Sequence, residues 1–180
     1  MHLLLSRLDS PIGELLLATD HEQRIHALDF ADHASRLHRG LRERCENHHL
    51  DNAQPPAFAL AALEAYFSGE FKALSQLSIE TAGSDLQEQV WKSVREIPAG
   101  ETTSYGALAR KLGFTDPRAA IDIGAAVGSN PIALIIPCHR VVASNGDLKG
   151  FAWGLHRKQW LLEHEKAIKP TPQTATLPGF

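Results

Sequence analysis

A cysteine and a histidine stand next to each other at positions 138 and 139, inside the run Ile-Ile-Pro-Cys-His-Arg-Val-Val that covers residues 135–142. A thiolate is a strong nucleophile, and a neighbouring imidazole is a usual acceptor for the thiol proton. A free thiol has a pKa of about 8.5, so little of it is ionised at neutral pH without such help. The pair predicts nucleophilic chemistry at sulfur. The alternative is an inert buried thiol, the common state of a free cysteine.

The bulk composition is that of an ordinary globular protein. The chain has 180 residues, 43% hydrophobic and 22% charged, with a net charge of -3. No apolar run approaches the ~20 residues that cross a bilayer, and the first residues lack the basic leader of a signal peptide. Only Cys45 and Cys138 are present, so there is no disulfide framework. We expect a cytoplasmic protein without membrane association.

The charge is distributed unevenly along the chain. Residues up to Ser84 include 7 Lys+Arg and 12 Asp+Glu, whereas those from Asp85 onward include 11 and 9. A mildly cationic second half is compatible with a partner that carries phosphates, although the imbalance alone does not establish one.

Residues 1–82 are predicted to form a small α/β domain built on an antiparallel sheet. Alternating apolar residues between turn signals indicate strands, and 3.6-residue periodicity indicates helices. Strands are expected at residues 3–7, 14–18, 24–30 and 74–80, helices at 34–44 and 57–67, and a polar loop at 45–49.

Residues 83–168 are predicted to form a second, mostly helical domain. Ser84 and Gln87 make a capping-box pattern before an apolar helix face. Two helices about a glycine turn suggest a helix-turn-helix, with Asp116 as N-cap and Pro117 as the first residue of its second helix. Helices are expected at 104–112, 118–128 and 157–166, a buried strand at 132–136, and a disordered tail at 169–180.

The helix at 118–128 carries almost no bulky side chains. Alanine or glycine occupies positions 119, 120, 124, 125, 126 and 128. The backbone of such a helix can approach a neighbour closely. Two interpretations follow, tight packing on another helix or insertion into a nucleic-acid groove.

Five blocks occur in order between Leu86 and Glu165. They are Val90-Trp91 with residues 97–100, residues 104–109, Ser129-Asn130-Pro131, residues 137–142 and residues 160–165. In sequence and spacing these blocks resemble the O6-alkylguanine-DNA alkyltransferases, also called methylated-DNA–protein-cysteine methyltransferases, of the short bacterial type. The resemblance implies an α+β fold, with a ribonuclease H-like N-terminal domain before a helix-turn-helix domain.

The resemblance also implies a reaction. An alkyl group, mainly methyl, would pass from O6 of guanine in double-stranded DNA irreversibly to Cys138, once per molecule. His139 would take the thiol proton through a water, and Glu165 would orient the imidazole. Asn130 would hold the turn that carries the cysteine. The expected partner is DNA with O6-alkylguanine, or with O4-alkylthymine, and the expected state is a monomer without cofactor or metal.

The target base would have to be flipped out of the duplex, from the minor groove, because the double helix hides its alkyl carbon. The resemblance assigns this rotation and a hydrogen bond to the base to Tyr105. The expected walls of the guanine pocket are Val141, Leu148, Lys149, Gly150, Phe151, Ala152 and Trp153. The expected DNA-facing residues are Arg118, Ala119, Ile121, Gly124, Ala125 and Gly128.

The sequence departs from the family pattern at two positions. Ile121 stands where the family usually has an arginine that fills the space left by the flipped nucleotide, and Asp122 follows it. We expect weaker DNA binding as a result. Trp153 stands where some relatives carry glycine, which predicts a narrower pocket that favours methyl over benzyl adducts.

Two other functions fit the same residues. A lesion-binding protein would recognise alkylguanine without accepting its alkyl group, and a thiol hydrolase would use Cys138, His139 and Glu165 on a small acyl substrate. The histidines His48 and His49 near Cys45 lack the spacing of a metal motif, which favours an exposed polar loop.

Overall fold

A four-stranded sheet forms the centre of the first of two units into which the chain divides. The computed structural model describes residues 1–170. Of these, unit 1 holds residues 1–82 and 131–135, and unit 2 holds residues 83–130 and 136–170. The strand order is β3-β2-β1-β4. The strands are β1 (His2–Leu8), β2 (Leu15–Thr19), β3 (Ile25–Phe30) and β4 (His49–Asn52).

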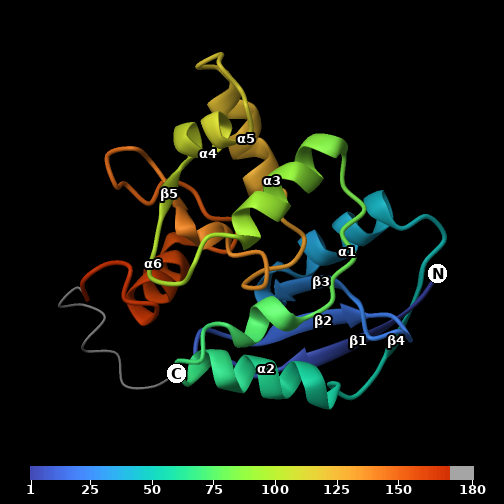
Figure 1. The fold of residues 1–180 in the computed structure, drawn as a ribbon. Coiled ribbons are helices and arrows are strands. Elements are labelled where there is room, and N and C mark those ends of the chain that lie inside the picture. The colour runs from blue at the N-terminus through green and yellow to red at the C-terminus, as the bar shows by residue number, and fades with distance from the viewer. Residues whose placement is uncertain (171–180) are drawn as a thin grey trace. The chain divides into compact units, whose positions relative to one another are not determined.

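Helices cover both faces of this sheet. All residues of β2 and β3 are buried, because leucines and other apolar residues point to either side. Helices α1 (Ala34–Arg44) and α2 (Ala57–Phe67) lie on opposite sides of the sheet (Figure 1). On the α1 side, Leu37 and Leu41 pack with residues of β1, β2 and β3. The predicted fold class is confirmed.

Two predictions for unit 1 are wrong. β4 begins at His49, the last residue of the predicted polar loop, and it pairs parallel with β1, whereas β1, β2 and β3 pair antiparallel. Residues 74–80 form no strand. A 3₁₀ helix, Ala73–Gln76, takes their first part, and only Ile79 bridges to Ile25. The three-residue spacing of Leu74 and Leu77 suits the period of a 3₁₀ turn.

The predicted strand at 132–136 is also absent. Ile132 makes a single parallel bridge to Leu28 within unit 1. The chain then turns at Leu134, which has a φ of 67°. All five residues are buried, as their apolar sequence predicts, but tight turns take the place of a ladder. Apolar composition alone therefore predicted the burial and not the conformation.

Unit 2 is mostly helical. Its elements are α3 (Asp85–Arg95), β5 (Thr103–Ser104), α4 (Tyr105–Lys111), α5 (Ala119–Gly128), a 3₁₀ helix (Cys138–Arg140), β6 (Val141–Val142) and α6 (Leu155–His164). The predicted capping box is present, because Ser84 and Gln87 exchange side-chain and backbone hydrogen bonds at the start of α3. The indole of Trp91 on α3 donates a hydrogen bond to the carbonyl of Ala126 on α5 (2.9 Å).

Helices α4 and α5 pack together as the predicted helix-turn-helix pair (Figure 1). The predicted start of α5 is wrong. Its N-cap is Arg118, without a side-chain cap, and Pro117 lies in the preceding turn. Asp116 instead closes that turn by accepting a hydrogen bond from the backbone N–H of Arg118 (2.9 Å).

Within residues 1–170, no helix has the length and apolar character needed to cross a membrane. Most of the predicted disordered tail, residues 171–180, lies outside the described residues.

Candidate active site

The nucleophile candidate Cys138 starts a 3₁₀ helix at the end of the buried apolar run. Its side chain is nearly buried, with 5% of the residue exposed. The side-chain N–H₂ of Asn130 donates to Sγ of Cys138 (3.1 Å) and also to the carbonyl of Ile136 (2.8 Å). Asn130 is fully buried and lies two residues after the end of α5. One amide thus fixes the turn before the cysteine and places a donor on the sulfur.

His139 joins Cys138 to a buried network of charged groups. Nε2 of His139 lies 2.9 Å from Oε1 of Glu165, at the end of α6. Arg140 donates from Nε and Nη2 to both oxygens of the same carboxylate, at 2.9 and 2.8 Å. Nδ1 of His139 is buried and has no hydrogen-bond partner among the described residues. The ring is therefore oriented from one nitrogen, and the other is available for proton transfer.

This network determines the protonation of the two groups. Burial lowers the pKa of His139, and the hydrogen bond and charge of Glu165 offset this only in part. Burial alone would raise the pKa of Glu165, but its bonds to His139 and Arg140 outweigh burial and hold the pKa well below its usual range. A neutral imidazole beside an ionised carboxylate is the resting state that a proton acceptor needs.

Cys138 faces a cavity of about 330 Å³, near the lower end of the range for small-ligand sites. The cavity is formed by α4, α5 and the loop before α6. Its lining residues are Tyr105, Gly124, Val127, Gly128, Cys138, Gly150, Phe151 and Ala152. Burial, followed by the charge of the Cys138 thiolate, raises the pKa of Tyr105, so this phenol keeps its proton.

Lys158 anchors the loop that closes the cavity. The residue is 1% exposed, and its Nζ donates to the carbonyls of Val141 (2.7 Å), Leu148 (2.6 Å) and Gly150 (3.3 Å). Burial lowers the pKa of Lys158 to about 8, against the attraction of the Cys138 thiolate. The ammonium group therefore links α6, β6 and the cavity loop.

Only part of the predicted pocket wall lines this cavity. Gly150, Phe151 and Ala152 do, whereas Val141, Leu148 and Lys149 are absent from its lining. Trp153 is also absent from the lining, and the prediction that it narrows the pocket stays a prediction. The indole is fully buried and packs edge-on against Phe151, with ring centroids 5.1 Å apart. Phe151, its ring partner, lines the cavity.

The predicted DNA-facing residues of α5 divide between three environments. Arg118, Ile121, Ala125 and Gly128 are exposed, and Ile121 is 73% exposed, which is unusual for a large apolar side chain. Gly124 is half-buried and lines the Cys138 cavity, as Gly128 also does. Ala119 is 7% exposed and packs inward, so it is not part of the exposed face.

Two residues of the site carried no role in the sequence interpretation. Arg140 lies inside the Cys-His block, and its position next to His139 was a signal that the sequence offered. Lys158 gave no such signal, because a lysine on a helix is ordinarily a solvated charge. Its partners are backbone carbonyls of three separate positions, which only the folded chain brings together.

The fold and the site together define a thiol-dependent protein with a helix-turn-helix unit. Its single cavity-facing cysteine lies beside a histidine–carboxylate pair, and its cavity is backed by a helix of small residues.

Comparison with known proteins gives the family. Residues 3–81 match the ribonuclease-like domain, and residues 85–167 the DNA-binding domain, of 6-O-methylguanine DNA methyltransferase. A methylated-DNA–protein-cysteine methyltransferase of Shigella flexneri is 37% identical over 92% of this chain and 96% of its own. The crystal structure of Mycobacterium tuberculosis OGT in complex with DNA has a TM-score of 0.74 and 38% identity, over 91% of this chain and 93% of that one. The chain belongs to the 6-O-methylguanine DNA methyltransferase family.

Proposed function

We propose that this protein repairs DNA by moving an alkyl group, mainly methyl, from O6 of guanine to Sγ of Cys138. The observation that carries the proposal is the cavity, because Cys138 is the only sulfur among its lining residues and Asn130 donates to that sulfur at 3.1 Å. Family membership supports the reaction class, and the M. tuberculosis relative in complex with DNA supports DNA as the partner.

The chemistry begins with the thiol proton. His139 takes it at Nδ1, through a water, while Nε2 stays bonded to Glu165. The thiolate, held by the Asn130 amide, then attacks the alkyl carbon. A carbon–sulfur bond forms and the carbon–O6 bond breaks, and the released electron pair moves onto the guanine, which takes up one proton. Tyr105 stays protonated in the cavity and donates a hydrogen bond to the base.

The reaction ends after one transfer. A thioether carbon–sulfur bond is stable in water, and no group in the described cavity is placed to remove the alkyl group. Each molecule therefore accepts one alkyl group and is consumed.

The target guanine reaches the cavity by rotating out of the duplex. We propose that α5 lies in the minor groove with Ile121, Ala125 and Gly128 toward the bases, since these residues, together with Asp122, form its exposed face. Small side chains permit close approach, and Ile121 acts as an apolar wedge. Gly124 and Gly128 connect this face to the Cys138 cavity, which gives the base a short path to the sulfur.

Intact mass spectrometry tests the proposal. The protein is incubated with an excess of duplex oligonucleotide that contains O6-methylguanine. The wild type is expected to gain the mass of one methyl group and then stop. Cys138→Ser should gain none. Cys45→Ser is the matched control, because Cys45 is the other cysteine and packs in the core of unit 1, and it should gain one methyl group.

Three other results would contradict the proposal and indicate a different function or a different residue. A wild type that binds the lesion and gains no mass is a lesion-binding protein. A methyl group found on Cys45 would contradict the assignment of Cys138. Sustained turnover of a small thioester or acyl substrate, without mass gain from DNA, would indicate a hydrolase.

A further inference from the structure

Three histidines and an aspartate meet on the surface of unit 1, which holds none of the residues of the proposed reaction. Nε2 of His2 lies 2.9 Å from Oδ2 of Asp51, and Nε2 of His49 lies 3.0 Å from Oδ1 of the same carboxylate. One ligand atom from each of His2, His49 and Asp51 lies within 4.8 Å of the others. Nε2 of His21 lies 3.2 Å from Nδ1 of His2.

The strand register brings these residues together. His2 pairs with His49 in the parallel β1–β4 pair, and Asp51 stands two residues further along the same face of β4. The intervening Leu50 points to the opposite face, into the core beside α1. The antiparallel β1–β2 register pairs Leu4 with Thr19, and its continuation sets His2 opposite His21 in the next turn.

The spacing of the atoms suits a metal ion. Zinc–nitrogen and zinc–oxygen bonds are about 2.0–2.2 Å, so two ligands of a tetrahedral site lie roughly 3.3–3.5 Å apart. The separations here bracket that value, and rotation of exposed side chains is enough to reach it. The site is exposed, with His2 and Asp51 about half accessible, so water can complete the coordination.

His21 has the position of a supporting group. A histidine that binds metal through Nε2 carries its proton on Nδ1, and this proton needs an acceptor that holds the ring in place. Nε2 of His21 is at hydrogen-bond distance from Nδ1 of His2, and the two rings stack with centroids 5.2 Å apart. The pair therefore selects the tautomer of His2 that leaves Nε2 open to a metal.

We propose that His2, His49 and Asp51 bind a divalent transition-metal ion, with zinc as the ion that best fits two imidazoles and one carboxylate. Imidazole ligands favour zinc, nickel and copper over magnesium and calcium, which prefer all-oxygen sites. The ion cross-links the short edge strand β4 to β1 and so stabilises unit 1. The proposal does not depend on alkyl transfer.

The test is a zinc titration of untagged protein in a Cys138→Ser background, which removes the reactive thiol as a competing ligand. Binding is measured by competition with a chromophoric chelator, and the geometry by the visible spectrum of the cobalt-substituted protein. We expect one zinc per chain and cobalt bands of a nitrogen–oxygen site without thiolate charge transfer. At zinc about 100-fold above Kd, Tm should rise by roughly 5–10 °C. Calcium should give no rise.

Variants locate the site. His49→Ala and the isosteric Asp51→Asn should each weaken zinc binding at least tenfold and abolish the rise in Tm. His48→Ala is the matched control, because the side chain of His48 faces the carbonyl of Cys45 and lies outside the cluster. It should bind zinc as its parent does. Absence of zinc binding by the parent, or unchanged affinity in both site variants with native circular dichroism, overturns the proposal.

Discussion

Glu165 is the residue on which the protonation of the site depends. It is 2% exposed and accepts hydrogen bonds from His139 and from two nitrogens of Arg140. A buried carboxylate is tolerated only when it is paired and hydrogen-bonded, and removing one partner of such a group costs about 3–5 kcal/mol. The residue is therefore important both to the stability of unit 2 and to the proposed chemistry.

Glu165→Gln is expected to destabilise the protein by about 3–5 kcal/mol at neutral pH, because Arg140 is left buried beside a neutral amide. The pKa of Glu165 is lower in the folded than in the unfolded protein. Its contribution to stability is then fully present above the unfolded value near 4.5, and is lost as pH falls below it. Urea unfolding of wild type and variant from pH 7 to 3 should give curves that converge toward acid. Parallel curves would contradict this prediction.

Ile121→Arg is expected to strengthen DNA binding. Ile121 is exposed on α5, and an arginine there could donate hydrogen bonds to the partner of the flipped base, a gain of about 1.5–3 kcal/mol. The second-order rate of methyl transfer to duplex DNA should rise about tenfold or more. Ile121→Lys, which adds charge without the planar fork, is the control and should gain less. An unchanged rate for Ile121→Arg would show that this position does not approach the DNA.

At the residue scale, the sequence allowed us to predict the reactive groups better than the residues that pack around them. The roles of Cys138, His139 and Glu165 were inferred from adjacent residues and from the blocks that resemble the family, and they remain proposals. The position of Trp153 behind Phe151 could not be inferred, because the packing of a loop depends on contacts distant in sequence. For the same reason Lys158 was missed.

Lys158 connects three elements of unit 2. Its ammonium bonds carbonyls of β6 and of the loop that includes Leu148 and Gly150, and Gly150 lines the cavity. Hydrogen bonds from a charged donor are worth about 1.5–3 kcal/mol each. Lys158 therefore contributes three of the hydrogen bonds that hold the loop and β6 to α6, and Arg157 on α6 adds one to the carbonyl of Trp153 (3.1 Å).

Lys158→Met keeps the apolar stem and removes the ammonium. We expect a loss of about 1.5–3 kcal/mol in stability and slower methyl transfer, because the loop wall is no longer fixed. Lys166→Met, at an exposed position beyond α6, is the control and should leave both unchanged. The rate is measured with saturating lesion DNA by quenched-flow mass analysis. A normal rate in Lys158→Met would refute the anchoring role.

The elements differ in how well local sequence predicts them. Helix α1 is amphipathic and α2 is a run of mostly apolar helix-forming residues, and the predicted bounds of both agree with the structure. β4 has only Leu50 to place on the core, and its other residues are polar. The segment forms a strand because the unpaired edge of β1 can bond to it, and no pattern within residues 49–52 predicts this pairing. Residues 132–136 are buried, but they form only the single bridge at Ile132 and therefore no strand.

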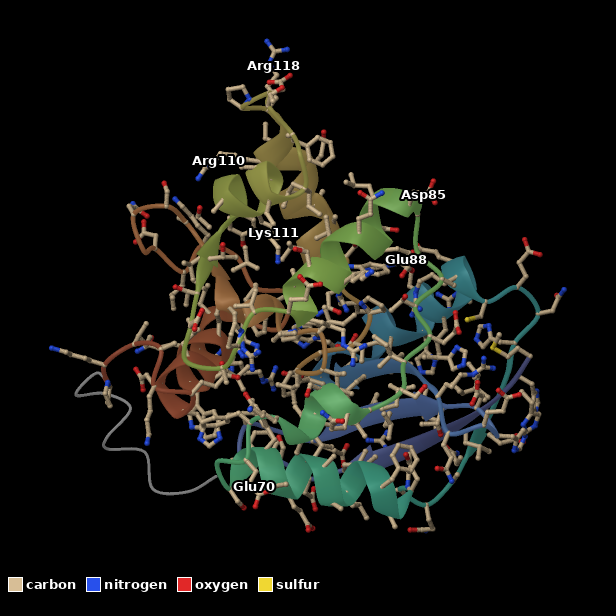
Figure 2. The ribbon with its side chains drawn as sticks, viewed as in Figure 1. Glu70, Asp85, Glu88, Arg110, Lys111 and Arg118 are labelled. Atoms are coloured by element: carbon tan, nitrogen blue, oxygen red, sulfur yellow. The ribbon has the colours of Figure 1, made fainter. Side chains whose placement is uncertain are left out.

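At the scale of the whole molecule, the helix-turn-helix pair carries only three Lys or Arg residues between positions 105 and 128, namely Arg110, Lys111 and Arg118, despite the basic second half. Figure 2 shows Arg110 on α4 and Arg118 before α5 with side chains directed outward, whereas Lys111 turns toward α3, where it pairs with Glu96 at 2.8 Å. With a net charge of -3, long-range attraction to DNA is weak. Affinity should come from a small number of phosphate contacts.

The double variant Arg110→Gln/Arg118→Gln is expected to reduce the slope of log K against log salt by about 2, close to 0.9 for each phosphate that the protein no longer neutralises. Fluorescence anisotropy with an undamaged duplex at several salt concentrations measures this slope. Lys111→Gln serves as control, and its slope should change less because Glu96 already neutralises the amine. Equal slopes for the double variant and wild type would place the DNA elsewhere.

Residue 82 remains our proposed boundary between the domains; one matched family region ends at residue 81 and the other begins at residue 85. The assignment of residues 131–135 to unit 1 has a consequence for that boundary. The chain leaves unit 2 after Asn130 and re-enters it at Ile136, two residues before Cys138. A fragment that begins at residue 83 would keep the apolar residues 131–135 without Leu28, with which Ile132 makes its bridge. Residues 131–135 are buried as part of unit 1, so we expect such a fragment to expose apolar side chains that the full chain buries.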